Sequence, residues 1–154
     1  MATTKLTQDF KEFLSLLNQG QIEYLLIGGY AVALYGAPRP TKDLDVWVSA
    51  SDENLDRLII ALEQFGFEKG SIHRDLFRQG QRVFRMGVVP NRLEILTQIA
   101  GVEFADCYRR RRRMVIDEIE VPVIDLNDLL ANKAATGRPR DLDDVRKLRA
   151  GLNP

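Results

Sequence analysis

The sequence has little cysteine and little histidine, one of each in 154 residues, and no excess charge, because 22 acidic side chains balance 22 basic ones. Cys107 alone cannot form an internal disulfide, so a reducing compartment is expected, with the cytoplasm as the default. His73 has no partners at the spacing of a zinc site or of a Ser-His-Asp triad. A net charge of zero gives no general attraction to nucleic acid.

Long apolar runs are also missing. No stretch approaches the roughly 20 residues that a membrane-spanning helix needs, and residues 1–9 are mostly polar, so no signal peptide is expected. The apolar share of 45% is ordinary for a globular protein. We expect a single domain over residues 1–154, with a core in about 7–124 and a helical segment in about 125–152.

Helical and strand-like patterns alternate along the chain without an internal repeat. Helices are expected at 8–20, 29–35, 52–66, 102–110, 125–137 and 139–152. Strands are expected at 24–27, 44–48, 83–87, 92–97, 114–116 and 121–124, with hairpin turns at 88–91 and 117–118. Thr7 is the predicted cap of the first helix, and Ser51 or Asp52 that of the third. This order predicts an α/β or α+β fold around one central sheet.

The most informative motif joins a glycine turn to a pair of aspartates. Gly28 and Gly29 follow the apolar run 24–27, and after thirteen intervening residues the chain reads Asp43-Leu44-Asp45. Without a Cβ, the glycines let the backbone turn sharply and approach a ligand closely, and the helix that follows would point its positive end at an anion. On a strand, Asp43 and Asp45 project from one face, where two carboxylates suit Mg²⁺. Taken singly, each part also fits an ordinary turn or a solvated strand face.

In combination, these parts resemble the nucleotidyltransferase superfamily of polymerase-beta-like minimal enzymes. That resemblance implies a central mixed sheet flanked by helices, with two C-terminal helices. It also implies Mg²⁺ as cofactor and a nucleoside triphosphate as substrate. Asp43 and Asp45 would be catalytic metal ligands, and Gly28 and Gly29 would approach the phosphates. Lys42, just before the aspartates, would contact the triphosphate.

A third carboxylate is expected on a neighbouring strand. In Arg92-Leu93-Glu94-Ile95-Leu96, Glu94 shares a strand face with Arg92 and Leu96. Glu94 would complete the metal site or accept a proton from the acceptor. The superfamily usually has aspartate there, so the glutamate departs by one methylene. A solvent-facing strand glutamate is the alternative.

The segment 132–144 resembles the Lys-x-x-Ala…Arg…Arg-Asp-x-x-Asp stretch of AbiEii-type toxin nucleotidyltransferases. By that resemblance Lys133 would contact the phosphates and Asp141 would assist the reaction, with Asp144 assigned less securely. The alternative is a helix end with local salt bridges, in which Asp141 caps the last helix. The five arginines at 109–113 could attract RNA, but neighbouring acids at 117, 118 and 120 favour a solvated, neutralised face.

Three functions therefore stay open. The first is nucleotidyl transfer to an RNA end (tRNA, for example) or to a protein, in a toxin–antitoxin or phage-defence setting that implies an antitoxin or a second subunit as partner. The second is transfer to a small molecule such as an aminoglycoside. The third is a descendant that binds nucleotide or a partner without catalysis.

Overall fold

The computed structural model describes residues 5–37, 41, 43–78, 83–88 and 91–152. These residues build a mixed six-stranded sheet in the order β3-β4-β2-β1-β6-β5. Its strands are β1 (Tyr24–Ile27), β2 (Asp43–Val48), β3 (Phe84–Met86), β4 (Arg92–Leu96), β5 (Arg112–Ile116) and β6 (Ile119–Val123). The predicted class, a mixed sheet with helices, is confirmed, and so are both predicted hairpins, β3–β4 and β5–β6.

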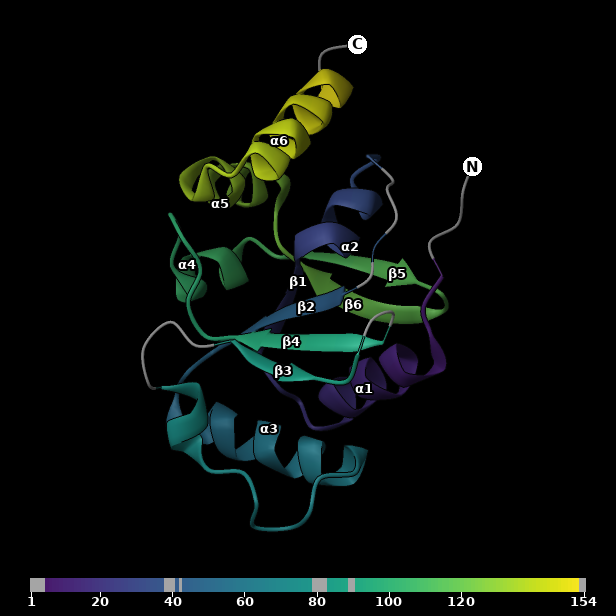
Figure 1. Ribbon diagram of the computed structural model, residues 1–154, viewed down its shortest axis with the longest axis vertical. Helices are drawn as coiled ribbons and strands as arrows, with labels where there is room; N and C mark the ends of the chain where they lie inside the picture. Colours follow the sequence, from purple (N-terminus) through teal and green to yellow (C-terminus); the bar gives the residue numbers. More distant parts are fainter. Residues whose placement is uncertain (1–4, 38–40, 42, 79–82, 89–90, 153–154) are drawn as a thin grey trace.

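Helices lie on both sides of this sheet (Figure 1). They are α1 (Gln8–Gln19), α2 (Gly28–Leu34), α3 (Asp52–Phe65), α4 (Phe104–Arg109), α5 (Leu126–Thr136) and α6 (Pro139–Leu152). In the view of Figure 1, α1 and α3 lie below the sheet, and α2, α5 and α6 lie above it. A short 3-10 helix, η1 (Arg74–Phe77), was not predicted, because four residues show no helical periodicity. None of the helices in the described ranges is long and apolar enough to cross a bilayer.

Side-chain caps fix where the first and third helices begin. The Thr7 hydroxyl accepts a hydrogen bond from the Phe10 amide at 3.2 Å. Ser51, not Asp52, caps α3, and its hydroxyl accepts from the Asn54 amide at 3.2 Å. Each cap satisfies an amide that the helix itself leaves unpaired, which is worth about 1 kcal/mol.

The core fills the space between the sheet and the two lower helices. Its fully buried side chains include Phe13, Leu14 and Leu17 of α1, and Leu55, Leu58 and Leu62 of α3. Burying each such side chain contributes about 1.5–3 kcal/mol. The amphipathic spacing that predicted both helices is therefore the spacing of core residues.

Asn54 ties the start of α3 to the ends of two strands. Its side-chain oxygen accepts from the Glu23 amide at 2.7 Å, and its side-chain nitrogen donates to the carbonyls of Glu23 and Ser49 at 3.0 and 2.9 Å. Because this amide is buried and fully paired, it fixes how β1 and β2 meet the helix layer. The order of β1 and β2 in turn positions the opposite ends of these strands, where Gly28 and Asp43 lie.

Candidate active site

The β2 strand separates acidic from apolar side chains by simple alternation. Leu44 and Val46 are completely buried on one face, whereas Asp43 and Asp45 lie on the other and are only partly covered. A strand places every second side chain on the same face. The expectation that both aspartates share one face is confirmed.

The β4 strand brings a third carboxylate beside this pair. It runs parallel to β2, with Glu94 opposite Asp45 and Arg92 opposite Asp43. Glu94 and Arg92 therefore lie on the face that carries the two aspartates. Three carboxylates from segments about fifty residues apart thus meet on adjacent strands, and we call Asp43, Asp45 and Glu94 the carboxylate corner.

Gly28 is the position against which Asp45 packs. Its φ angle is 69°, a left-handed value that favours glycine. A Cβ at this position would lie 2.2 Å from Oδ2 of Asp45, far inside van der Waals contact. Glycine is therefore required twice, for the backbone turn into α2 and for the room that the carboxylate occupies. Gly29, the second predicted glycine, lies buried in the first turn of α2.

Burial and neighbouring carboxylates raise the pKa of Asp45 to about 7. The largest cause is burial, and the hydrogen bond with Glu94 and the negative charges of Glu94 and Asp43 add to it, while the positive charge of Lys133 acts against it. In addition, Oδ1 of Asp45 is buried without a hydrogen-bond partner among the described residues. Such a group of carboxylates is stabilised by any cation that enters it, whether proton or metal.

Arginines are the present counter-ions of the other two carboxylates. The Arg92 guanidinium donates to both oxygens of Asp43, from Nε at 3.0 Å and from Nη2 at 2.8 Å. Its Nε also lies 3.6 Å from Glu94. Arg85 of β3, opposite Glu94 in register, donates from Nε to Glu94 at 2.9 Å. The strand pattern placed Arg92 on this face but indicated no role for either arginine.

The corner fits a magnesium ion in its chemistry. All three donors are hard carboxylate oxygens, and Gly28 leaves room for Asp45, whose Oδ1 finds no hydrogen-bond partner in the described part of the chain. As now arranged, the described residues contain no group of three acidic, histidine or cysteine side chains spaced to hold an ion. Asp43 and Glu94 bind arginines instead.

A second polar cluster joins α5 to α6. The Lys133 ammonium lies 3.2 Å from Asp141 and 3.2 Å from Asp144, and all three side chains are buried. Asp141 also accepts from the Thr136 hydroxyl at 2.7 Å and from Arg138 Nε at 2.6 Å. Because α6 starts at Pro139, Asp141 lies inside the helix and is not its cap.

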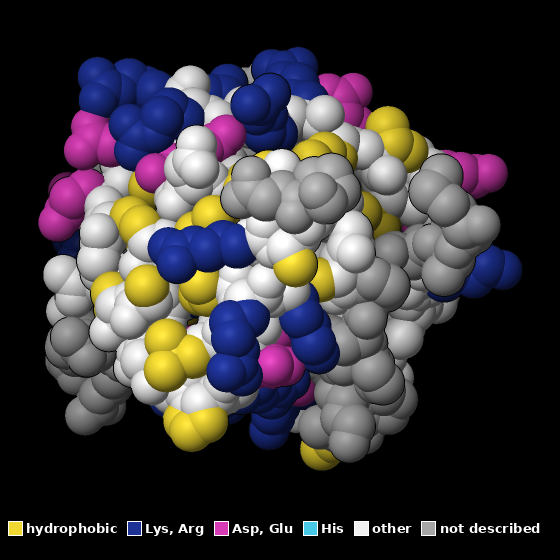
Figure 2. Space-filling model, turned by 90° about the horizontal axis from the view of Figure 1, so that it is seen from above, with side chains coloured by type: hydrophobic (Ala, Val, Ile, Leu, Met, Phe, Trp, Pro, Cys, Tyr) yellow, Lys and Arg dark blue, Asp and Glu magenta, His cyan; other side chains and the backbone are white. Residues whose placement is uncertain are grey.

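This cluster faces the carboxylate corner closely enough for their charges to interact. Lys133 lowers the pKa of Asp45, and the pKa of Arg138 is raised first by Asp141 and further by Asp45 and Glu94. The Arg138 side chain is 73% exposed, whereas that of Lys133 is 8% exposed. Arg138 is thus the more accessible cation, although the sequence had singled out Lys133. Figure 2 views the molecule from above Figure 1, the side on which α2, α5 and α6 lie, and shows Lys and Arg side chains around a small acidic patch.

Comparison with known families decides the assignment. Residues 4–149 match the family described as "Nucleotidyltransferase of unknown function (DUF6036)". The chain belongs to this family. The nucleotidyltransferase assignment is therefore confirmed, at the level of the superfamily.

Solved structures share the fold of this DUF6036 member at low sequence identity. The lincosamide antibiotic adenylyltransferase LnuA, lincomycin-bound, is 14% identical over 96% of this chain and 99% of its own, with a TM-score of 0.58. A putative nucleotidyltransferase from Thermotoga maritima is 15% identical over 94% and 90%, with a TM-score of 0.60. ANT(2")-Ia in complex with adenylyl-2"-tobramycin is 15% identical over 94% and 87%, with a TM-score of 0.59. Comparison with curated proteins returns no match.

Two further sequence expectations concern basic residues. Lys42, predicted to contact the triphosphate, lies outside the described residues. The arginines 109–113 of this DUF6036 member spread in different directions, as the neutralised alternative requires, but only one of the expected acids is a partner within the described ranges. Their contacts are Arg109 with Asp106, Arg110 with Asp128, Arg111 over the Tyr108 ring, Arg112 with Asp125 and Arg113 with Glu120.

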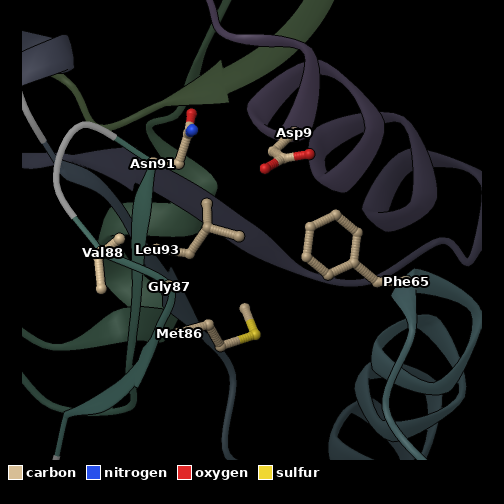
Figure 3. Close-up of a pocket in the computed structure, with 7 residues that line it drawn as sticks. All are labelled: Asp9, Phe65, Met86, Gly87, Val88, Asn91 and Leu93. Atoms are coloured by element: carbon tan, nitrogen blue, oxygen red, sulfur yellow. The ribbon is translucent and has the colours of Figure 1, made fainter.

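The hollow drawn in Figure 3 is not the predicted site. It is lined by Asp9, Phe65, Met86, Gly87, Val88, Asn91 and Leu93. These residues come from α1, the end of α3 and the β3–β4 hairpin, and Leu93 belongs to the strand face opposite to Glu94. The corner lies instead on the side of the sheet that α2 covers, since Gly28 packs against Asp45.

Gly28→Ala should lower the free energy of unfolding by about 2–4 kcal/mol, because a left-handed backbone and an overlap with Asp45 both penalise the methyl group. Gly70→Ala is the matched control. Gly70 also has a positive φ, 82°, but a Cβ placed there would meet no atom of the described residues within 4 Å. This control should cost about 1–2 kcal/mol. Urea unfolding of both variants measures the difference, and equal losses would contradict the close approach to Asp45.

Acid should weaken the α5–α6 cluster. Burial alone would raise the pKa of Asp141, but hydrogen bonds from Arg138, Thr136 and Lys133 outweigh it and lower the pKa to about 2. Since the unfolded chain binds this proton near pH 4, the stabilisation is complete above pH 4 and is lost as the pH falls towards 2. Asp141→Asn should flatten this part of the stability profile in thermal unfolding scans.

Asp143→Asn is the control for this titration, because Asp143 is an exposed neighbour on α6 that pairs with Arg146 and Lys147 at the surface. It should leave most of the slope between pH 4 and pH 2 in place. If Asp141→Asn and Asp143→Asn gave the same profile, the buried cluster would not be the source of the slope.

Proposed function

We propose that the chain transfers a nucleoside monophosphate from a nucleoside triphosphate to an acceptor, with Mg²⁺ held at the carboxylate corner. The observation that carries this proposal is the meeting of Asp43, Asp45 and Glu94 on one face of adjacent strands, in a chain of a nucleotidyltransferase family. Asp43 and Asp45 would be the metal ligands and Glu94 the third. A bound Mg²⁺ would supply positive charge, which would offset the negative charge of the phosphates.

The protein's own groups have separable tasks in such a transfer. An oxygen of the acceptor forms the new bond to the α-phosphorus while the bond to the pyrophosphate breaks. Glu94 would complete the metal site or take the acceptor's proton. The Gly28–Gly29 turn would lie against the phosphates, and Lys42 would contact them.

Cations of the α5–α6 cluster would offset charge on the departing pyrophosphate. Lys133 would act through its positive electrostatic potential and not by direct contact, because its ammonium is buried between Asp141 and Asp144. Arg138, held by Asp141 but largely exposed, can reach a ligand directly. Asp141 would then position Arg138 and Lys133 and would not itself touch the substrate.

A small hydroxyl-bearing acceptor is favoured by two observations. The similar folds include LnuA with lincomycin and ANT(2")-Ia with adenylyl-2"-tobramycin, and this chain spans 99% and 87% of them. Four of the five arginines in the run 109–113 are paired with carboxylates, which offsets the positive charge that would attract RNA there. An RNA end or a protein, in a toxin–antitoxin setting, is the second candidate, favoured by the AbiEii-like segment 132–144.

Replacing Asp43 and Asp45 together by Asn should abolish Mg²⁺-dependent triphosphate binding, with at least about a hundredfold loss of affinity in calorimetry, because both oxygen pairs lose their charge. The fold should persist, since Asp45 loses a charge that burial disfavours and Asp43 loses only a partly exposed ion pair with Arg92. Asp56→Asn, an exposed carboxylate on α3 that pairs with Arg74, is the control and should bind like the wild type. Unchanged binding in the double variant would rule out the carboxylate corner as the metal site.

The acceptor can be identified by label transfer. The chain is incubated with Mg²⁺ and each α-³²P-labelled triphosphate, in separate pools of small hydroxyl compounds, tRNA and cell protein. Label in the small-molecule pool is the expected result. Label in RNA or protein would replace it with the second candidate, and triphosphate binding without transfer to any pool would indicate a chain that binds nucleotide without catalysis.

A further inference from the structure

Arg92 occupies the oxygens of Asp43 that a metal ion would need. Its two parallel hydrogen bonds, at 3.0 and 2.8 Å, use one oxygen each. The β2–β4 register places Arg92 directly opposite Asp43, so this pairing is built into the sheet. A guanidinium in this geometry is among the stronger partners of a carboxylate.

What holds Arg92 in place is the same negative charge that a metal ion would neutralise. Its pKa is raised by the hydrogen bonds and charge of Asp43, and further by Glu94 and Asp45. Its side chain pairs with Asp43 and Glu94, and 37% of its surface is exposed. A divalent ion at the corner would cancel that attraction and repel the guanidinium.

A triphosphate offers Arg92 an alternative partner of the same shape. Phosphate oxygens accept paired hydrogen bonds from a guanidinium as carboxylate oxygens do. The long arginine side chain starts beside the corner, within reach of phosphates held against it. When Arg92 exchanges Asp43 for a phosphate, one ion pair replaces another and little free energy is lost. When a metal ion alone displaces Arg92 into water, the free energy of the ion pair with Asp43 is lost without replacement.

We propose that Arg92 is an exchangeable counter-ion, which blocks Asp43 in the free protein and moves to the triphosphate when metal and nucleotide bind together. Metal binding and triphosphate binding are then mutually dependent, and the free protein holds a divalent ion only weakly. This inference rests on the proposed function, because it concerns the same site. It assigns to Arg92 a role in phosphate contact and in the order of binding.

The test is binding of Mn²⁺, followed by electron paramagnetic resonance, with and without an α,β-methylene triphosphate that cannot be cleaved. Without nucleotide, Arg92→Gln should bind Mn²⁺ about tenfold more tightly than the wild type, because its competitor is gone. With the triphosphate analogue, Arg92→Gln should lose about tenfold in affinity for the nucleotide. Arg92→Lys keeps the charge but not the paired geometry. Its affinities for Mn²⁺ and for the nucleotide should lie between those of the wild type and those of Arg92→Gln.

Arg74→Gln is the matched control, since the Arg74 guanidinium also donates to both oxygens of one carboxylate, that of Asp56 on α3, away from the carboxylate corner. It should change Mn²⁺ affinity without nucleotide by less than about threefold. Equal Mn²⁺ affinity of the wild type and Arg92→Gln, with normal binding of the metal–triphosphate pair in the wild type, would overturn the role of Arg92 and leave the proposed function standing. Absence of any metal–triphosphate binding in the wild type would overturn both.

Discussion

The parallel register of β2 on β4 sets the geometry of the whole site. It places Glu94 beside Asp45 and Arg92 beside Asp43, so that acids and a base meet on one face of the sheet. A shift of one residue would turn every side chain of β4 to the other face and bury charge in the core. The completely buried Leu44 and Val46, with Leu93 and Ile95 beside them, resist that shift. The hydrophobic core thereby fixes the electrostatics of the opposite face.

The electrostatic consequence is a group of charges that is balanced by exchangeable partners. Asp43 and Glu94 are paired with arginines, and burial together with the neighbouring carboxylates raises the pKa of Asp45 to about 7. Buried charge of this kind costs free energy unless a partner is present. The α5–α6 cluster follows the same principle, because Lys133 is buried between two aspartates. Binding of a metal and phosphates would redistribute these partners without requiring a change of fold.

Features that depend on neighbouring residues, such as strand faces and helix positions, could be predicted from the sequence. Alternation in 43–48 placed Asp43 and Asp45 on one face, and the spacing of apolar residues after Thr7 predicted a helix that the structure confirms. The family resemblance also selected Glu94 as the third carboxylate, and the strand register places it beside Asp45. The partners of Arg92 and Lys133 could not be predicted from local patterns. Those of Arg92 depend on the strand register, and those of Lys133 depend on how α6 folds back over α5. The same holds for most of the run 109–113, whose acidic partners lie in α4, in β6 and at the start of α5.

The proposed function requires that Asp43 and Asp45 bind a divalent ion together with a triphosphate. Anomalous diffraction from crystals grown with Mn²⁺ and a triphosphate analogue that cannot be cleaved would locate that ion. We expect an anomalous peak within about 2.5 Å of oxygens of both aspartates, with the Arg92 guanidinium on phosphate oxygens. A peak elsewhere, or a nucleotide bound while Arg92 still pairs with Asp43 and no ion lies at the corner, would contradict this assignment.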